Sequence, residues 1–268
     1  MRRRGSIILR SALVVFFLLA SNGHADQNVP PVDEIVQKAN LASYYEGTDG
    51  RAQVDMTITD SQGRTRNRRF TILRMDKEDG GKQKFYVYFH LPADVRNTVF
   101  MVWKHPGKDD DRWLYLPGLD LVKRISGGDK RTSFAGSNFF YEDVSGRHPQ
   151  EDNHEIMEVT DTFYVLKNTP KKPADVEFAH YLLWIDKTNF LPMKAEYYDK
   201  NGGKYRIVEA IEVKEIQGHP TVTQASVQDL NSGGNTVSVF SDVKYDLGIE
   251  EAIFTERYLR RPPRQWLK

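Results

Sequence analysis

The chain contains serines whose neighbourhood could support nucleophilic catalysis. Ser126, Ser133 and Ser137 lie close in sequence to Lys130, and a nearby base can activate a serine hydroxyl. However, the G-x-S-x-G pattern of a nucleophile elbow is missing, and no glycine-rich phosphate loop leads from a strand into a helix. A Ser/Lys arrangement therefore stays an open alternative, but we predict no catalytic residue.

Potential metal ligands are present without the spacing that metal sites require. Asp109, Asp110 and Asp111 lack the spaced oxygen ligands and distal glutamate of a calcium loop, which favours a solvated turn. His148 and His154 flank an acidic stretch but form no H-E-x-x-H pattern. The chain has no cysteine, which excludes disulfides, thiol catalysis and thiolate ligands. We predict neither a metal nor a cofactor.

A charged triplet precedes an unusual aromatic segment. Residues 134–143, named the lid segment here, contain Phe134, Phe139 and Phe140 among glycines and serines. Such a segment can cover an apolar space, or it can be a surface loop that its aromatic side chains pin to the core. Lys130 and Arg131 in the triplet Asp129-Lys130-Arg131 form either a solvated cluster or a latch that meets an anion of the lid segment or of a head group.

The rest of the pattern predicts a protein that is mainly β. Residues 31–45 have the first-turn proline, early acids and apolar spacing of a helix. Short helices are expected near the lid segment and at residues 250–257, where they would help to cover the sheet. About a dozen short strands joined by tight turns predict one antiparallel sheet that curls. The expected strands are 53–59, 69–72, 84–90, 98–104, 113–116, 119–125, 154–160, 163–168, 178–186, 192–199, 205–213, 221–229 and 236–245.

Alternation of period two indicates which side chains point inward. In residues 53–59, apolar and polar side chains alternate, as in a strand with one buried face. A curled sheet that few helices cover leaves an apolar hollow, which suits a lipid ligand. The predicted ligand-binding residues combine these inward positions with the lid aromatics: Val54, Met56, Ile58, Phe70, Ile72, Met101, Val239, Phe134, Phe139 and Phe140.

The N-terminus has the features of a cleavable export signal. A basic region with four arginines precedes the short apolar stretch 12–20, and small residues at 23–25 offer a cleavage site. About 20 apolar residues are needed to span a membrane, so a membrane anchor is the weaker reading. Cleavage after Ala25 would leave one domain, residues 26–268, soluble in the periplasm. Its 34 basic and 37 acidic residues give a charge of −3, which does not favour nucleic-acid binding.

Several motifs give the chain a family resemblance. They are W-x-Y-L-P at 113–117, V-K-R-I-S at 122–126 and G-S-x-F-x-Y-E-D at 136–143, with flanking likeness at 49–74, 88–105 and 254–266. Together these segments resemble the LolA-like outer membrane lipoprotein-sorting family. The resemblance implies a single curved, unclosed antiparallel sheet, or half-barrel, with a few helices on its concave side. It also implies a periplasmic protein that binds lipid or lipoprotein.

From these patterns we expect a carrier and not an enzyme. The carrier would act as a monomer, hold lipid or lipoprotein cargo in its hollow and transfer it toward the outer membrane. The resemblance implies an inner-membrane donor of the resistance-nodulation-division (RND) type. One alternative is an accessory module that docks on such a transporter and carries no cargo, and another is an envelope hydrolase that uses serine. The basic C-terminus with Trp266 is either a solvated tail or a site of transient contact with a membrane surface or an acidic partner.

Overall fold

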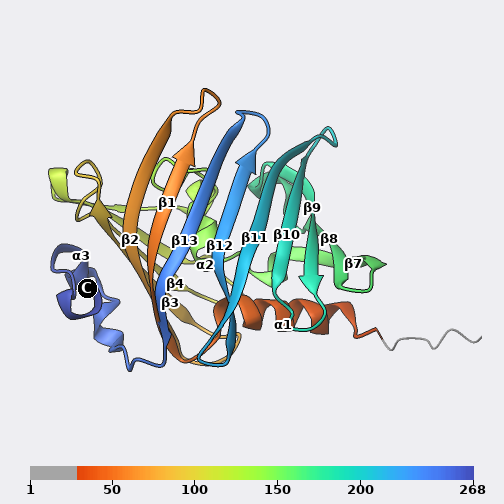
Figure 1. Ribbon diagram of the computed structural model, residues 1–268, viewed down its shortest axis with the longest axis horizontal. Coiled ribbons are helices and arrows are strands. Elements are labelled where there is room, and N and C mark those ends of the chain that lie inside the picture. The colour runs from red at the N-terminus through yellow and green to blue at the C-terminus, as the bar shows by residue number, and fades with distance from the viewer. Residues whose placement is uncertain (1–28) are drawn as a thin grey trace, which may run out of the picture. The chain divides into compact units, whose positions relative to one another are not determined.

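One antiparallel sheet of thirteen strands dominates the described residues, 29–268, of a computed structural model (Figure 1). The strand order is β6-β5-β4-β3-β2-β1-β13-β12-β11-β10-β9-β8-β7, and because β6 and β7 do not pair, the sheet is unclosed. The strands are β1 Asp49–Thr59, β2 Thr65–Asp76, β3 Gln83–Leu91, β4 Val99–Lys104, β5 Asp111–Leu116, β6 Leu121–Arg124, β7 Asp152–Val159, β8 Phe163–Pro170, β9 Phe178–Asp186, β10 Pro192–Asp199, β11 Lys204–Ile216, β12 His219–Asp229 and β13 Gly234–Tyr245. The predicted fold class is confirmed.

The helices are α1 Val32–Tyr44, α2 Tyr141–Ser145 and α3 Glu256–Arg260, and residues 31–268 group into one compact unit. The predicted export signal, residues 1–25, lies outside the described residues. In the part of the chain that is described, no helix has the length and apolar character needed to cross a membrane.

Alternation in β1 and its neighbours produces an inner face with apolar side chains. Val54, Met56 and Ile58 of β1 are buried, whereas Asp55 and Thr57 between them are exposed. This pattern follows from the period-two geometry of a strand, which places successive side chains on opposite faces. The inner face therefore carries the apolar residues that the sequence predicted for β1.

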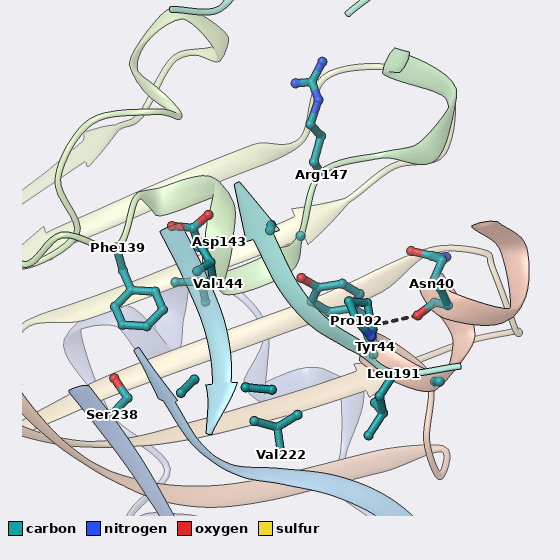
Figure 2. A pocket seen from close by; sticks show the side chains of 18 of the residues that line it. Asn40, Tyr44, Phe139, Asp143, Val144, Arg147, Leu191, Pro192, Val222 and Ser238 are labelled. Atoms are coloured by element: carbon teal, nitrogen blue, oxygen red, sulfur yellow. Dashed lines mark hydrogen bonds between the residues drawn. The ribbon is translucent and has the colours of Figure 1, made fainter. Parts of the chain in front are cut away.

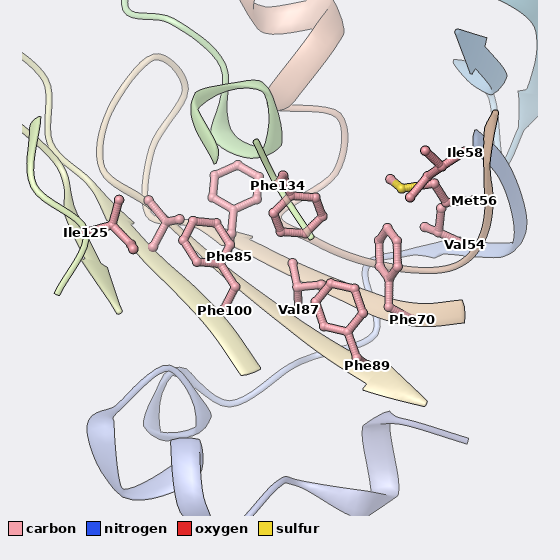
Figure 3. Packing of buried hydrophobic residues seen from close by; sticks show 11 residues of the cluster. Val54, Met56, Ile58, Phe70, Phe85, Val87, Phe89, Phe100, Ile125 and Phe134 are labelled. Atoms are coloured by element: carbon pink, nitrogen blue, oxygen red, sulfur yellow. The ribbon is translucent and has the colours of Figure 1, made fainter. Parts of the chain in front are cut away.

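Two helices lie on the inner face of the sheet. Pro31 precedes the first turn of α1, and the helix buries Ile35 and Ala39 against Leu166 of β8 and Ile185 of β9. Helix α2 begins in the last three residues of the lid segment and faces the strands β2 to β5 on the same side (Figure 3). The helix predicted within the lid segment forms later in the chain than expected, at Tyr141–Ser145.

The C-terminal segment covers the outer face instead of the inner one. Residues predicted as a helix at 250–257 form the 3-10 turn Glu251–Ile253 and the start of α3. Figure 3 shows the C-terminal segment across the strands from α2. Its residues Phe254 and Leu259 pack with Leu73 and Met101 of the sheet. The expectation that this segment helps to cover the hollow is wrong, because β2 to β5 carry apolar residues on both faces and the outer face also needs a cover.

Candidate functional site

A cavity of about 510 Å³ lies between the inner face of the sheet and the helices α1 and α2 (Figure 2). One part of its wall consists of apolar side chains from β1 to β3, β13 and the lid segment, including Val54, Met56, Phe70, Phe139 and Phe240. The opposite part comes from β8 to β12 and contributes Leu183, Ala195, Val208, Val222 and Ala225. A volume of this size is in the range of small-molecule sites.

Six of the ten predicted ligand-binding residues line this cavity. They are Val54, Met56, Phe70, Ile72, Phe134 and Phe139. Ile58 is buried in the adjoining apolar cluster, beyond the cavity wall. The first half of the sheet, where alternation is regular, therefore places its predicted residues around one space.

Three predicted residues lie elsewhere. Met101 is fully buried on the outer face, because it pairs with Tyr86 and Trp113 in the cluster under the C-terminal segment. Val239 is 44 % exposed and points away from the cavity, since its neighbour Ser238 is the cavity-lining residue. Phe140 does not line the cavity, and the guanidinium groups of Arg131 and Arg206 lie over its ring. The prediction of a ligand-facing position is wrong for all three.

Sequence reasoning missed the part of the wall that β9 to β11 provide. In these strands the register shifts between Pro192 and Lys194 and between Ala210 and Glu212. Each bulge reverses which residues face inward, so a simple period-two reading loses the inner face. The apolar stretch at Leu182-Leu183 was the remaining signal, but it does not identify which of the two leucines faces the cavity.

The lid segment is anchored by an aromatic cluster (Figure 3). Phe134 is 2 % exposed, and its ring centroid lies 5.9 Å from that of Phe70, 5.6 Å from Phe89 and 5.7 Å from Phe100. These contacts hold the start of the segment against the inner face. The side chain of Phe139, only half-buried, faces the cavity instead (Figure 2).

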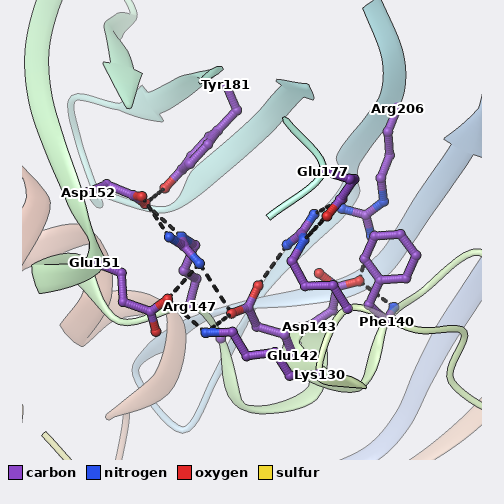
Figure 4. A network of polar contacts seen from close by, with 12 residues as sticks. Lys130, Phe140, Glu142, Asp143, Arg147, Glu151, Asp152, Glu177, Tyr181 and Arg206 are labelled. Carbon is purple, nitrogen blue, oxygen red and sulfur yellow. Dashed lines mark hydrogen bonds and ion pairs between the residues drawn. The ribbon is translucent and has the colours of Figure 1, made fainter. Parts of the chain in front are cut away.

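The predicted latch residues contact α2 in a buried network of charges (Figure 4). Lys130 Nζ lies 2.9 Å from Glu142 Oε1, and Arg131 Nη1 lies 2.7 Å from Glu142 Oε2. A third cation, Arg147, lies 3.4 Å from the same carboxylate. The side chains of Lys130 and Arg131 are less than a tenth exposed, so the solvated-cluster alternative is wrong. Their role as a latch stays a prediction.

Burial and charge set the protonation of this network. Burial alone would raise the pKa of the Glu142 carboxyl, but its three cationic partners outweigh this effect and lower the pKa to about 2. Arg131 also forms an ion pair of 2.7 Å with Glu177, which precedes β9. The network therefore links the charged side of α2 to the far half of the sheet.

The other polar candidates have structural roles in the described residues. Asp110 is buried and pairs with Arg112 and, at 2.8 Å, with His148, so the prediction of a solvated turn is wrong at this position. Ser133 and Ser137 donate hydrogen bonds to backbone carbonyl groups of the lid segment, and Lys130 binds glutamates instead of a serine. The Ser/Lys arrangement is therefore not assembled. Residues 29–268 contain no cluster of histidine and acidic side chains that could hold a metal.

Comparisons with known proteins agree with this geometry. A family model described as "Uncharacterized protein" matches residues 81–261. A DUF1329 family protein from Desulfovibrio piger is 30 % identical, with 86 % of this chain and 100 % of that chain covered and a TM-score of 0.77. A domain from Vibrio parahaemolyticus, named for outer membrane lipoprotein sorting, is 28 % identical, with 85 % and 97 % covered and a TM-score of 0.77.

A more distant solved structure shares the fold alone. It is a LolA superfamily protein from Nitrosomonas europaea, 22 % identical, with 86 % of this chain and 100 % of that chain covered and a TM-score of 0.65. Among curated proteins, no match was found.

Proposed function

The chain belongs to the DUF1329 family and has a LolA-like lipoprotein-sorting fold, and on this premise we propose that it is a periplasmic carrier. It binds the acyl chains of a lipid or of a lipoprotein in the cavity and transfers them toward the outer membrane. The name of the Vibrio relative supports lipoprotein as a cargo. The export signal predicted at residues 1–25 supports the periplasm as the compartment.

The apolar wall of the cavity carries this proposal. Val54, Met56, Phe70 and Ile72 line it from β1 and β2, and Phe139 lines it from the lid segment. A wall of this kind stabilises a hydrocarbon chain by about 25 cal/mol for each Å² removed from water. Against these apolar side chains, a sugar or an ion would lose hydration without gaining a polar partner. Met56 adds a flexible side chain that can adapt to chains of different shape.

The structure of the site supports a carrier function over the two alternative functions. An accessory module that only docks on an RND-type transporter needs no apolar cavity of about 510 Å³. A serine hydrolase needs a nucleophile and a base in contact, and Lys130 is instead paired with Glu142 and Glu151. We keep the RND-type transporter as the proposed donor of cargo and a monomer as the acting form, on the strength of the family resemblance.

Retained lipid provides the direct test. Full-length protein processed in cells is purified from a membrane-containing lysate without detergent and analysed by native mass spectrometry. We expect wild-type protein with an added mass that extracts into organic solvent as a lipid. Met56→Asp should remove this mass, because a carboxylate in the apolar wall costs several kcal/mol and disfavours an acyl chain beside it. Ile72→Asp, at a less buried position of the same wall, should act in the same way.

Val239→Asp is the matched control for these variants. Val239 is one residue from Ser238, the cross-strand partner of Met56, but its side chain is exposed on the outer face. Circular dichroism establishes that each variant is folded. A folded Met56→Asp protein that keeps its lipid, or a wild-type protein that never holds one, contradicts the carrier.

A further inference from the structure

Ser238 presents an unusual hydroxyl group to the cavity. The residue is 2 % exposed, and its Oγ atom has no hydrogen-bond partner in the described structure. Its cross-strand neighbours on the inner face are Met56 of β1 and Ala225 of β12, which both line the cavity. A buried hydroxyl without a partner is costly, and most native proteins avoid it. An acceptor atom on a bound ligand would satisfy this group.

The preceding hydroxyl on the same face of β13 differs from that of Ser238, because it has hydrogen-bond partners. Thr236 lies two residues away on the same face and is fully buried. Its Oγ1 donates to Asn138 Oδ1 at 2.8 Å and accepts from the Asn138 backbone N–H at 3.0 Å. The lid segment thus satisfies Thr236 and leaves the Ser238 hydroxyl directed at the cavity.

The cations around the cavity are not available to a ligand. In the described structure, each arginine or lysine that contributes to the wall already forms an ion pair with a carboxylate of the chain. The pairs are Arg51 with Asp242, Arg74 with Asp76, Arg147 with Asp152 and Lys194 with Glu196. A ligand carboxylate in this space would therefore be buried without a counter-charge, which strongly disfavours its ionised form.

The remaining polar groups of the wall include neutral phenols. Tyr44 of α1 and Tyr197 of β10 both line the cavity. Burial raises the pKa of each phenol, so both keep their protons at neutral pH. Neutral hydroxyl groups can donate hydrogen bonds to a carbonyl oxygen, but they do not neutralise a negative charge.

Resting on the proposed carrier function, we infer that the cavity selects neutral, ester-linked acyl chains over free fatty acids, with Ser238 Oγ–H as a donor to the ester carbonyl. The apolar wall holds the chain, and the hydroxyl holds the point at which the chain is esterified. Both a free glyceride lipid and the acylated end of a lipoprotein contain this ester group. The ionised carboxylate of a fatty acid finds no free cation in the wall and binds weakly.

Binding of a long-chain fatty acid and of its methyl ester tests this inference. Both compete with a neutral fluorescent acyl ester on delipidated protein at pH 8 and at pH 5. We expect the ester to bind at least about tenfold more tightly at pH 8, and the difference to narrow at pH 5 as the acid becomes protonated. Equal binding of acid and ester at pH 8 overturns the selectivity but leaves the carrier intact. Failure of both ligands to bind counts against the carrier itself.

Two serine variants test the contribution of the Ser238 hydroxyl group to ester binding. Ser238→Ala should weaken ester binding about three- to tenfold while leaving a plain hydrocarbon chain unaffected. Ser226→Ala is the matched control, because Ser226 follows Ala225 on β12 and therefore points to the opposite face. An unchanged ester affinity in Ser238→Ala overturns the role of this residue. Competition by a diacylglycerol and by a diacylated lipopeptide then distinguishes free lipid from lipoprotein as the source of the ester.

Discussion

Lys104 Nζ of β4 lies 2.6 Å from the carbonyl oxygen of Ser145, the last residue of α2. The same amine donates to the Gly146 carbonyl at 3.2 Å, so it satisfies two carbonyl groups where the helix ends. Lys104 is 2 % exposed, and burial lowers the pKa of its amine to about 8. A single buried lysine therefore ties α2 to the sheet, and this contact depends on pH.

Stability should rise with pH because of Lys104. Its folded-state pKa of about 8 lies below the ordinary value of 10.5, so between these values the unfolded chain binds more protons than the folded one. The free energy of unfolding therefore increases over this window, by at most about 3 kcal/mol. Urea unfolding of the wild type and of Lys104→Met from pH 7.5 to pH 10 measures the effect. The variant should be less stable and lack the increase, and an identical slope in both proteins would refute the assignment.

Glu142 should control stability in acid. Its folded pKa of about 2 lies below the ordinary 4.5, so its contribution is complete above pH 4.5 and is lost as the pH falls to about 2. Glu142→Gln should cost about 3–5 kcal/mol at neutral pH, because it leaves buried cations without their carboxylate. Thermal unfolding between pH 7 and pH 2 gives the comparison. Glu155→Gln on β7, at an exposed position, is the control and should follow the wild type.

The lid segment should respond differently to loss of each phenylalanine. Phe139 lines the cavity, whereas Phe140 lies over Arg131 and Arg206, with its ring centroid 5.0 Å and 4.4 Å from their guanidinium carbons. Phe139→Ala removes apolar contact worth at most about 1.5–3 kcal/mol and should speed ligand exchange. Phe140→Ala should leave that rate unchanged. Hydrogen exchange of residues 133–143 provides the structural measurement, with and without bound lipid. If the amides of residues 133–143 are as protected from exchange as those of the central strands, and lipid does not change this protection, the segment is a pinned loop and not a lid.

The C-terminal segment should stabilise the sheet without contributing to the cavity. Leu259 of α3 is fully buried against the outer face, in a cluster with Leu73 and Met101. Leu259→Ala should lower the free energy of unfolding by about 2–5 kcal/mol, since it leaves a void in a packed cluster. Lipid retained per folded molecule should stay constant in native mass spectra. A folded variant with reduced lipid would mean that the outer face also participates in binding.

Gly146 should be required where α2 meets α1. Its φ is +75°, and a Cβ atom there would lie 2.3 Å from Tyr44 Cζ. Gly146→Ala should therefore cost more than the roughly 1–2 kcal/mol of a left-handed residue and should displace the Tyr44 ring into the cavity. Gly107→Ala is the matched control, because Gly107 has φ of +77° with open space around it. Chemical denaturation measures both variants, and an equal loss of stability in Gly146→Ala and Gly107→Ala would show that the contact with Tyr44 is unimportant.

The sequence alone determined the class of fold and the part of the cavity wall that β1 and β2 provide. In β1 and β2 a regular alternation places Val54, Met56 and Phe70 on one face, and this assignment needs no knowledge of neighbouring strands. The lid aromatics were also recognisable, because glycine and serine separate them from the strands. These signals are local, so they survive without tertiary information.

Only the tertiary structure decided which face several residues occupy and how the charges pair. Met101 lies in a strand whose first five residues are all apolar, and its outward position follows from the path of the C-terminal segment. On β13 the pairing of Ser238 with Met56 turns a hydroxyl inward and exposes Val239, although hydrophobicity favours the reverse. Glu142 meets its cations only after the chain folds back on itself. Register and long-range pairing depend on the whole sheet, and the local sequence does not contain them.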